Sequence, residues 1–331
     1  MGVTIRKTLD TCFPVGRNAG TDTVENHDGF VFKNDNWTRW RVSRPFVDER
    51  GAAEWLKQKI DVMIKTGLNQ HVDLVLGSDD SQSRREAGAA GAREENRSYM
   101  LDLQRKVGET VIIRFSGTGF CNLFDEMGLE IYTFFSLDYP DLLKEYLDLS
   151  LQNELNRVHA AADPELSPVI LIPEDFATKQ GPIFNPQFLG DYHYPYVKKL
   201  TEAWHDHDIK AIYHSDGNYR KAVPDLINCG VDGFYCLEPN CGMDIVELKK
   251  QWPAMVWAGG VDRVDGVELM EKGTPKQVKE EVRRHIESTN ALQEGGMFVP
   301  TSSEISPTIK PENFTAMVEA VGENYNKDFR T

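Results

Sequence analysis

The segment Lys210–Asn218, KAIYHSDGN, constrains the fold of this chain most. It begins as an apolar run with branched and aromatic side chains, typical of a buried parallel strand, and it ends in polar residues and a glycine. Such a strand carries His214 and Asp216 to its carboxyl end, where Gly217 lets the chain turn away. Enzymes with α/β folds place their chemistry at this end of a strand, so the segment predicts an α/β enzyme.

Strand-like runs that end in polar residues alternate with helical patterns along the chain. The predicted strands lie at residues 72–80, 110–119, 167–176, 210–216, 230–240, 254–263 and 295–306. The predicted helices lie at residues 54–67, 99–107, 139–161, 186–206, 218–230, 243–252, 275–293 and 311–325. Regular βα alternation requires parallel strands, and its repetition favours a closed (β/α)8 TIM-type barrel as a single domain.

The N-terminal segment is less regular than the rest. We predict that residues 1–50 form an irregular segment that packs on a barrel of residues 51–331. Within it, residues 30–34 and 38–42 are compatible with a short hairpin. The predicted strands are one short of a complete barrel, so the first strand either lies within residues 1–50 or is missing. An irregular or shortened first βα unit follows from both alternatives.

Two residues give local helix signals. Pro195 is predicted to kink or break the helix at 186–206, because its ring has no N–H to donate and clashes with the preceding turn. Thr274 is predicted to be the N-cap of the helix that starts at Pro275.

Charge and composition exclude some classes of partner. A formal net charge of −15 and a pI near 5.0 argue against nucleic acid and anionic membranes, which bind basic surfaces. The sequence has neither an apolar run of the ~18 residues that a membrane span needs nor a signal-peptide core, so we expect a cytoplasmic protein. Five cysteines without a CxxC pair predict reduced thiols.

Polar residues at the strand ends form a candidate site. In a parallel barrel the carboxyl ends of all strands share one face, so residues distant in sequence become neighbours there. Each residue taken singly fits a capping or turn role, but their recurrence at one face predicts a carboxylate-rich mouth with one histidine. The candidates are Asp79, Ser116, Glu174, His214, Asp216, Glu238, Asn240, Asp262, Ser303 and Glu304.

The spacing of His214 and Asp216 is chemically informative. Residues two apart on an extended backbone project to the same side. The pair is therefore either part of a metal site completed by Glu238, Glu174 or Glu304, or a hydrogen-bonded acid/base pair. Nitrogen and oxygen ligands suit Zn²⁺ acting as a Lewis acid. A histidine that is fixed by a carboxylate and only holds the loop is the structural alternative.

Two cysteines and a glycine pair lie near the same strand ends. Cys236 and Cys241 flank Glu238, so either thiolate could bind a metal, but the place of Cys236 in an apolar run favours a small core residue. The pair Gly259–Gly260 allows either a close approach of the backbone to a ligand or a tight turn of the barrel.

Four segments of the chain carry a family resemblance: HSDGN (214–218), LEPNCGMDIVELKK (237–250), AGGVD (258–262) and EGGMFVPTSSEISPTIKPENFTAMVEAV (294–321). Together they resemble the uroporphyrinogen decarboxylase superfamily, and more closely its corrinoid-linked methyltransferase branch. The resemblance is specific from about Pro168 to the C-terminus and looser from Val72 to Leu123. It implies a TIM-type barrel.

The decarboxylase positions of the family are only partly present. The resemblance places the catalytic aspartate on Asp79, but the tyrosine falls near Asp125 and the late histidine on Ser303. The arginine-rich motif of the first strand, which grips the tetrapyrrole carboxylates, has no counterpart. An acidic pocket would also repel this polycarboxylate substrate, so we do not expect decarboxylation of uroporphyrinogen.

The methyltransferase positions are matched at the histidine. In that branch a His-x-Cys pair and a late cysteine bind zinc; His214 matches the histidine, while Asp216 and Ser303 stand at the cysteine positions. The resemblance therefore implies zinc on harder ligands, which polarises an oxygen such as the ether oxygen of a methoxylated substrate. The cobalamin of a corrinoid protein takes the methyl group in such an O-demethylation.

The leading prediction is a zinc-assisted methyltransferase that moves a methyl group from a small methoxylated or methylated substrate to a cobalamin protein. The predicted roles are catalytic for Asp79, His214 and Asp216, substrate-binding for Ser116, Glu174, Asn240, Asp262 and Ser303, and metal-binding for His214, Asp216, Glu238 and Glu304. One alternative is a metal-free decarboxylase or lyase in which Asp79 stabilises a developing cation. Another is a barrel that binds a tetrapyrrole or corrinoid without turnover. A homodimer is one option for the assembly.

Overall fold

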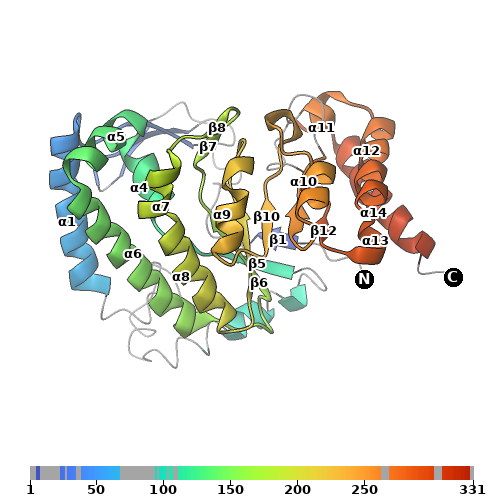
Figure 1. The fold of residues 1–331 in the computed structure, drawn as a ribbon, viewed down its shortest axis with the longest axis horizontal. Helices are drawn as coiled ribbons and strands as arrows, with labels where there is room; N and C mark the ends of the chain where they lie inside the picture. The colour runs from blue at the N-terminus through green and yellow to red at the C-terminus, as the bar shows by residue number, and fades with distance from the viewer. Residues whose placement is uncertain are drawn as a thin grey trace. The chain divides into compact units, whose positions relative to one another are not determined.

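The described residues of the computed structural model divide into two compact units. Unit 1 contains Val169–Tyr194 and Lys210–Thr331, and unit 2 contains Ile5–Pro168 and Pro195–Ile209. The structure describes residues 5–7, 23–26, 28–34, 39–67, 94, 97–102, 104–106, 111–261, 268–301 and 308–328 (Figure 1). The two units are considered separately below.

Unit 1 is built on a run of parallel strands. Their order across the sheet is β6 (Val169–Pro173), β9 (Lys210–His214), β10 (Gly233–Tyr235), β11 (Val256–Ala258) and β12 (Met297–Phe298). Strands enclosed on both faces carry continuous apolar runs, and β6 and β9 have this character. Ile170, Ile172, Ala211 and Tyr213 are all buried. The predicted strand at 210–216 is therefore a central strand with neighbours on both sides.

Two short strands and several helices accompany the parallel strands of unit 1. The short strands, β7 (Ala177–Thr178) and β8 (Gly181–Pro182), form an antiparallel pair. The helices are α7 (Pro186–Tyr192), η1 (Arg220–Ala222), α9 (Val223–Asn228), η2 (Pro239–Cys241), α10 (Ile245–Gln251), α11 (Glu268–Lys272), α12 (Pro275–Ser288), α13 (Ala291–Glu294) and α14 (Pro311–Asp328). α12, α13 and α14 lie together at the C-terminal end, orange to red in Figure 1.

Apolar packing and a cap define the C-terminal helices. Val278 and Val282 of α12 and Ala320 of α14 belong to one buried apolar cluster. The side chain of Thr274 accepts a hydrogen bond from the backbone N–H of Gln277, and the side-chain oxygen of Gln277 accepts one from the backbone N–H of Thr274. This capping box confirms the predicted N-cap.

The backbone comes unusually close to itself after β11. Gly259 has φ +131, and a Cβ atom at this position would lie 2.6 Å from the backbone nitrogen of Leu237, which follows β10. Only glycine allows this approach. Of the two interpretations of the glycine pair, the structure supports the tight turn, because Gly259 packs against protein backbone.

Unit 2 contains the missing first strand. β1 (Ile5–Lys7) pairs in parallel with β5 (Val111–Phe115), so the strand that sequence patterns did not locate lies within residues 1–50. β2 (Thr23–Glu25), β3 (Val31–Asn34) and β4 (Arg39–Ser43) form a separate antiparallel sheet. The pairing of β3 with β4 confirms the predicted hairpin.

The helices of unit 2 are α1 (Glu49–Gly67), α4 (Phe120–Met127), α5 (Leu129–Asp138), α6 (Pro140–Ala161) and most of α8 (Tyr194–His205). The single helix predicted at 186–206 is two helices, because α7 ends at Tyr192 and α8 starts at Tyr194. Pro195 lies in the first turn of α8, where its missing N–H costs little, which confirms the predicted break.

Two further features bear on the predicted environment of the protein. None of the helices in the described part of the chain combines the length and the apolar character that a bilayer crossing requires. The four described cysteines, Cys121, Cys229, Cys236 and Cys241, are buried thiols, as the cysteine spacing predicted.

Candidate functional site

His214 is the last residue of the central strand β9. Its backbone pairs with Pro173 of β6 on one side and with Tyr235 of β10 on the other. The imidazole lies near the Tyr235 ring, with centroids 5.3 Å apart and planes tilted by 30°, and only 13% of the side chain is exposed. The two neighbouring strands therefore fix the position of this histidine.

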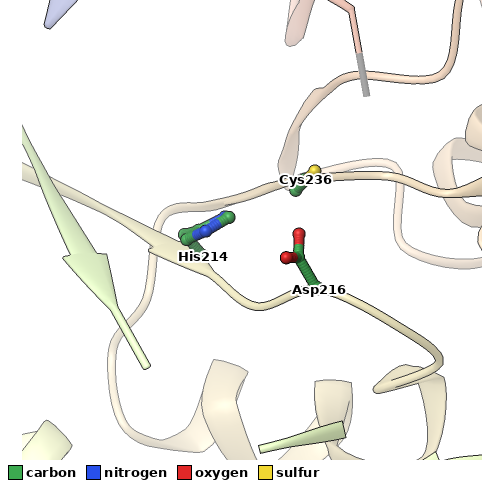
Figure 2. A group of neighbouring side chains, drawn as sticks. All are labelled: His214, Asp216 and Cys236. Atoms are coloured by element: carbon green, nitrogen blue, oxygen red, sulfur yellow. The ribbon is translucent and has the colours of Figure 1, made fainter. Parts of the chain in front are cut away.

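Three potential metal ligands meet at this strand end. In the described part of the chain, one ligand atom each from His214, Asp216 and Cys236 lie within 4.8 Å of one another. Figure 2 shows the three side chains around one space. Asp216 is exposed and Cys236 is fully buried, so the group is accessible from the Asp216 side. The prediction that His214 and Asp216 project to the same side is confirmed.

Hydrogen bonds hold Asp216 in this group. Its backbone N–H donates to Oδ1 of Asp175 at 2.9 Å, and its carbonyl accepts from the Ser215 hydroxyl at 2.9 Å. Partial desolvation by the surrounding chain and repulsion from Asp175 raise the pKa of the Asp216 carboxyl, although His214 and a hydrogen bond with the Cys236 thiol oppose the shift. A cation in the group would relieve this repulsion.

The two ring nitrogens of His214 have different surroundings. Nε2 lies 3.6 Å from Oδ1 of Asp175. Nδ1 is buried and has no hydrogen-bond partner among the described residues. A buried polar atom left unsatisfied costs about 1–3 kcal/mol, so Nδ1 is suited to a ligand that the protein itself does not supply.

Gly217 and Glu238 shape the turn that follows. Gly217 has φ +77, and a Cβ atom there would lie 2.7 Å from the carbonyl oxygen of Thr178. Its N–H donates to Oε2 of Glu238 at 2.5 Å, and the Cys241 thiol donates to the same oxygen at 3.6 Å. Glu238, predicted as a metal ligand, lies outside the three-residue group and bonds to the backbone of this turn. In the described structure Glu238 therefore clamps this turn, and its predicted role as a metal ligand stays a prediction.

Cys241 does not act as a thiolate here. Burial, followed by the nearby Glu238 carboxylate, raises the pKa of the Cys241 thiol to about 11, so the thiol stays protonated at neutral pH. Of the two cysteines that flank Glu238, Cys236 is the one that lies with His214.

The predicted substrate contacts occupy different environments. Glu174 is 1% exposed, and its backbone N–H donates to the carbonyl of His214 at 2.9 Å. Oδ1 of Asn240, in η2, is buried without a hydrogen-bond partner in the described part of the structure. Asn240 therefore keeps an acceptor for a ligand, and its predicted role stays a prediction.

Ser116 in unit 2 is better explained as a structural residue. It is 2% exposed, its hydroxyl donates to the Glu154 carboxylate, and it accepts a hydrogen bond from Nε1 of Trp204 at 2.8 Å. These bonds lie within unit 2 and make Ser116 part of a buried network, and its predicted role as a substrate contact stays a prediction. Four predicted residues lie outside the described residues and stay predictions: Asp79, Asp262, Ser303 and Glu304.

Asp175 and Cys236 are the residues whose importance the sequence patterns underrated. Asp175 belongs to the polar pair at the end of β6, and neighbouring residues on an extended chain face opposite sides. Glu174 is the predicted candidate of this pair, whereas the structure places Asp175 next to His214. Cys236 is buried as expected for a core residue, but its sulfur also belongs to the ligand group.

Comparison with known families identifies one match. The family described as Uroporphyrinogen decarboxylase (URO-D) matches residues 103–324, about two thirds of the chain, including β9, β10 and the three-residue group. A search of curated proteins finds no match. Proteins of the matching family are TIM barrels, and the parallel βα order of the structure agrees, so the predicted α/β barrel class is confirmed.

Proposed function

The chain belongs to the uroporphyrinogen decarboxylase family, whose members are generally enzymes, and from this membership we propose that it is a methyltransferase of a corrinoid-dependent system. It moves a methyl group from a small methoxylated or methylated substrate to the cobalamin of a partner protein. The observation that carries the proposal is the group of His214, Asp216 and Cys236 at the ends of two adjacent parallel strands.

The three residues fit a zinc ion. Imidazole nitrogen, carboxylate oxygen and thiolate sulfur are the donors that zinc takes in proteins, and catalytic zinc sites use three protein ligands with a fourth position open. Nδ1 of His214 is buried without a partner among the described residues, which leaves a lone pair for a metal. Burial, followed by the nearby Asp175 carboxylate, raises the pKa of the Asp216 carboxyl, and a cation bound there would favour the ionised form. We therefore assign His214, Asp216 and Cys236 as the zinc ligands.

The chemistry divides between the metal and the protein. When bound, zinc supplies Lewis acidity that makes a methoxyl or similar group a better methyl donor. The methyl carbon leaves its oxygen without the bonding electron pair and bonds to cob(I)alamin, and the oxygen takes up a proton from solvent. The chain holds the ligands from rigid strand ends and exposes the group on the Asp216 side, where a substrate and a partner can approach.

Metal content and methyl transfer test this proposal together. We expect about one zinc per chain and transfer of methyl groups from methoxylated or methylated compounds to free cob(I)alamin. His214→Ala, Asp216→Ala and Cys236→Ser should lose both properties. Cys229→Ser, which changes a buried thiol bonded to the Tyr194 carbonyl, is the matched control and should keep both.

Other combinations of zinc content and methyl transfer would contradict the proposal in different ways. Zinc without methyl transfer from any donor would overturn the methyltransferase assignment and leave a binding barrel. Absence of zinc together with absence of methyl transfer would favour a metal-free decarboxylase or lyase. Methyl transfer that survives in Cys236→Ser with full zinc content would show that the ligand set is wrong.

A further inference from the structure

We propose that Asp175 is a positioning residue that holds the His214 imidazole so that Nδ1, and not Nε2, is the metal ligand. The inference rests on the proposed zinc site and extends it to a residue beyond the ligands. It follows from three observations on one side chain and its neighbours.

The first observation is that one oxygen of Asp175 lies near both His214, the last residue of β9, and Asp216, which follows that strand. Oδ1 lies 3.6 Å from Nε2 of His214, and it accepts the backbone N–H of Asp216 at 2.9 Å. Asp175 follows β6, whereas His214 ends β9 and Asp216 follows it, so this oxygen links the ends of two neighbouring strands beside the ligands.

The second observation concerns the imidazole. Nδ1 is buried without a hydrogen-bond partner among the described residues, while Nε2 faces a carboxylate. A carboxylate beside one ring nitrogen favours the tautomer with the proton on that nitrogen, which leaves a lone pair on the other. The ring of His214 is therefore prepared to bind a metal through Nδ1.

The third observation is that Asp175 does not belong to the ligand group. The mutually close ligand atoms come from His214, Asp216 and Cys236, and Asp175 is not among them. Metal-bound histidines commonly donate their second N–H to a carboxylate, which orients the ring and increases its basicity. Asp175 is a carboxylate beside the second ring nitrogen of His214, as in such sites.

Zinc affinity separates positioning from ligation. Competition with a chromogenic chelator should show about 10- to 100-fold weaker zinc binding for Asp175→Ala, with the wild-type stoichiometry restored at saturating zinc. Asp175→Asn keeps an oxygen that can accept from Nε2 and from Asp216, so it should recover most of the affinity. Asp191→Ala is the control, since Asp191 is an exposed acid of unit 1 that bonds to Gln187 and should leave zinc binding unchanged.

Nitrogen NMR of the histidine rings reports which ring nitrogen of His214 is protonated and which binds the metal. A purely structural role of Asp175 would leave both unchanged. In zinc-loaded wild type, the His214 resonances should show a metal-bound Nδ1 and a protonated Nε2, assigned by their absence in His214→Gln. In metal-free protein, Asp175→Ala should shift the tautomer away from the Nε2–H form. If Asp175→Ala does not fold, Asp175→Asn and the wild-type spectra still test the tautomer.

The outcomes are distinct from those of the proposed function. Unchanged affinity and tautomer in Asp175→Ala, a metal-bound Nε2, or loss of stoichiometry at saturating zinc would each overturn the positioning role. Zinc-loaded wild type that transfers no methyl group would overturn the proposed function and leave this inference standing. Wild type that binds no zinc would overturn the inference, while cobalamin methylation measured separately would still decide the function.

Discussion

Glu238 offers the sharpest test of how the site is built, because the sequence predicts a metal ligand and the structure shows a clamp. Its Oε2 accepts the N–H of Gly217, which is buried in the turn directly after Asp216. Glu238→Ala removes this acceptor and leaves a buried N–H without a partner. The turn should then open more often, while the zinc ligands themselves stay unchanged.

The size of the effect follows from the type of bond. A hydrogen bond to a charged acceptor contributes about 1.5–3 kcal/mol, and a neutral one about 0.5–1.5 kcal/mol. Glu238→Ala should therefore speed amide exchange in the turn by about 12- to 140-fold, at about 1.4 kcal/mol per tenfold change. Glu238→Gln keeps a neutral acceptor and loses about 1 kcal/mol, which corresponds to about fivefold.

Hydrogen exchange of metal-free protein, read by mass spectrometry on peptides covering residues 214–219, measures this opening directly. Glu202→Ala, at an exposed position of α8 in unit 2, serves as the control and should not alter these peptides. Zinc content is measured in parallel. If Glu238→Ala exchanged these amides at the wild-type rate and lost its zinc, the clamp would be refuted and Glu238 would be a ligand.

Three further predictions concern other parts of the chain. Burial alone would raise the pKa of Glu281, but hydrogen bonds led by the one from His285 lower it to about 2. Its contribution to stability is thus complete above pH 4.5 and lost as pH falls toward 2, so Glu281→Gln should flatten the decline of melting temperature in this window. Burial raises the pKa of the Cys241 thiol from 9.0 to about 11. Labelling of this thiol by iodoacetamide, followed by mass spectrometry, should therefore be slow at pH 8. The unfolding free energy should fall as pH rises from 9.0 to about 11, because the unfolded state loses the proton first. Thr274→Ala should lower the urea midpoint by an amount equivalent to about 1 kcal/mol, and Thr274→Ser should restore it.

The placement of His214 and Asp216 could be predicted because it depends only on local rules. An apolar run determines a buried strand, and the two-residue period of a strand places both side chains on one side. The same holds for the helix break at Pro195 and the cap at Thr274, since each follows from the backbone chemistry of one residue.

Cys236 and Asp175 were underrated because their roles depend on pairing register. The register that opposes Tyr235 to His214 brings the next residue, Cys236, beside the site, and nothing in an apolar run distinguishes that cysteine from a core residue. Similarly, the strand end alone does not say whether Glu174 or Asp175 faces the histidine. β1 went unrecognised because three residues are too few for periodicity to be visible.

The close approach of Gly259 to Leu237 also limits how this protein can be re-engineered. A directed-evolution library aimed at new substrates gains nothing from randomising Gly259, because even a methyl group would meet the Leu237 backbone at 2.6 Å and force two strand ends apart. Diversity is better spent on a side chain such as Asn240, whose amide oxygen lacks a partner in the described structure. New specificity should therefore come from side chains mounted on an unaltered backbone.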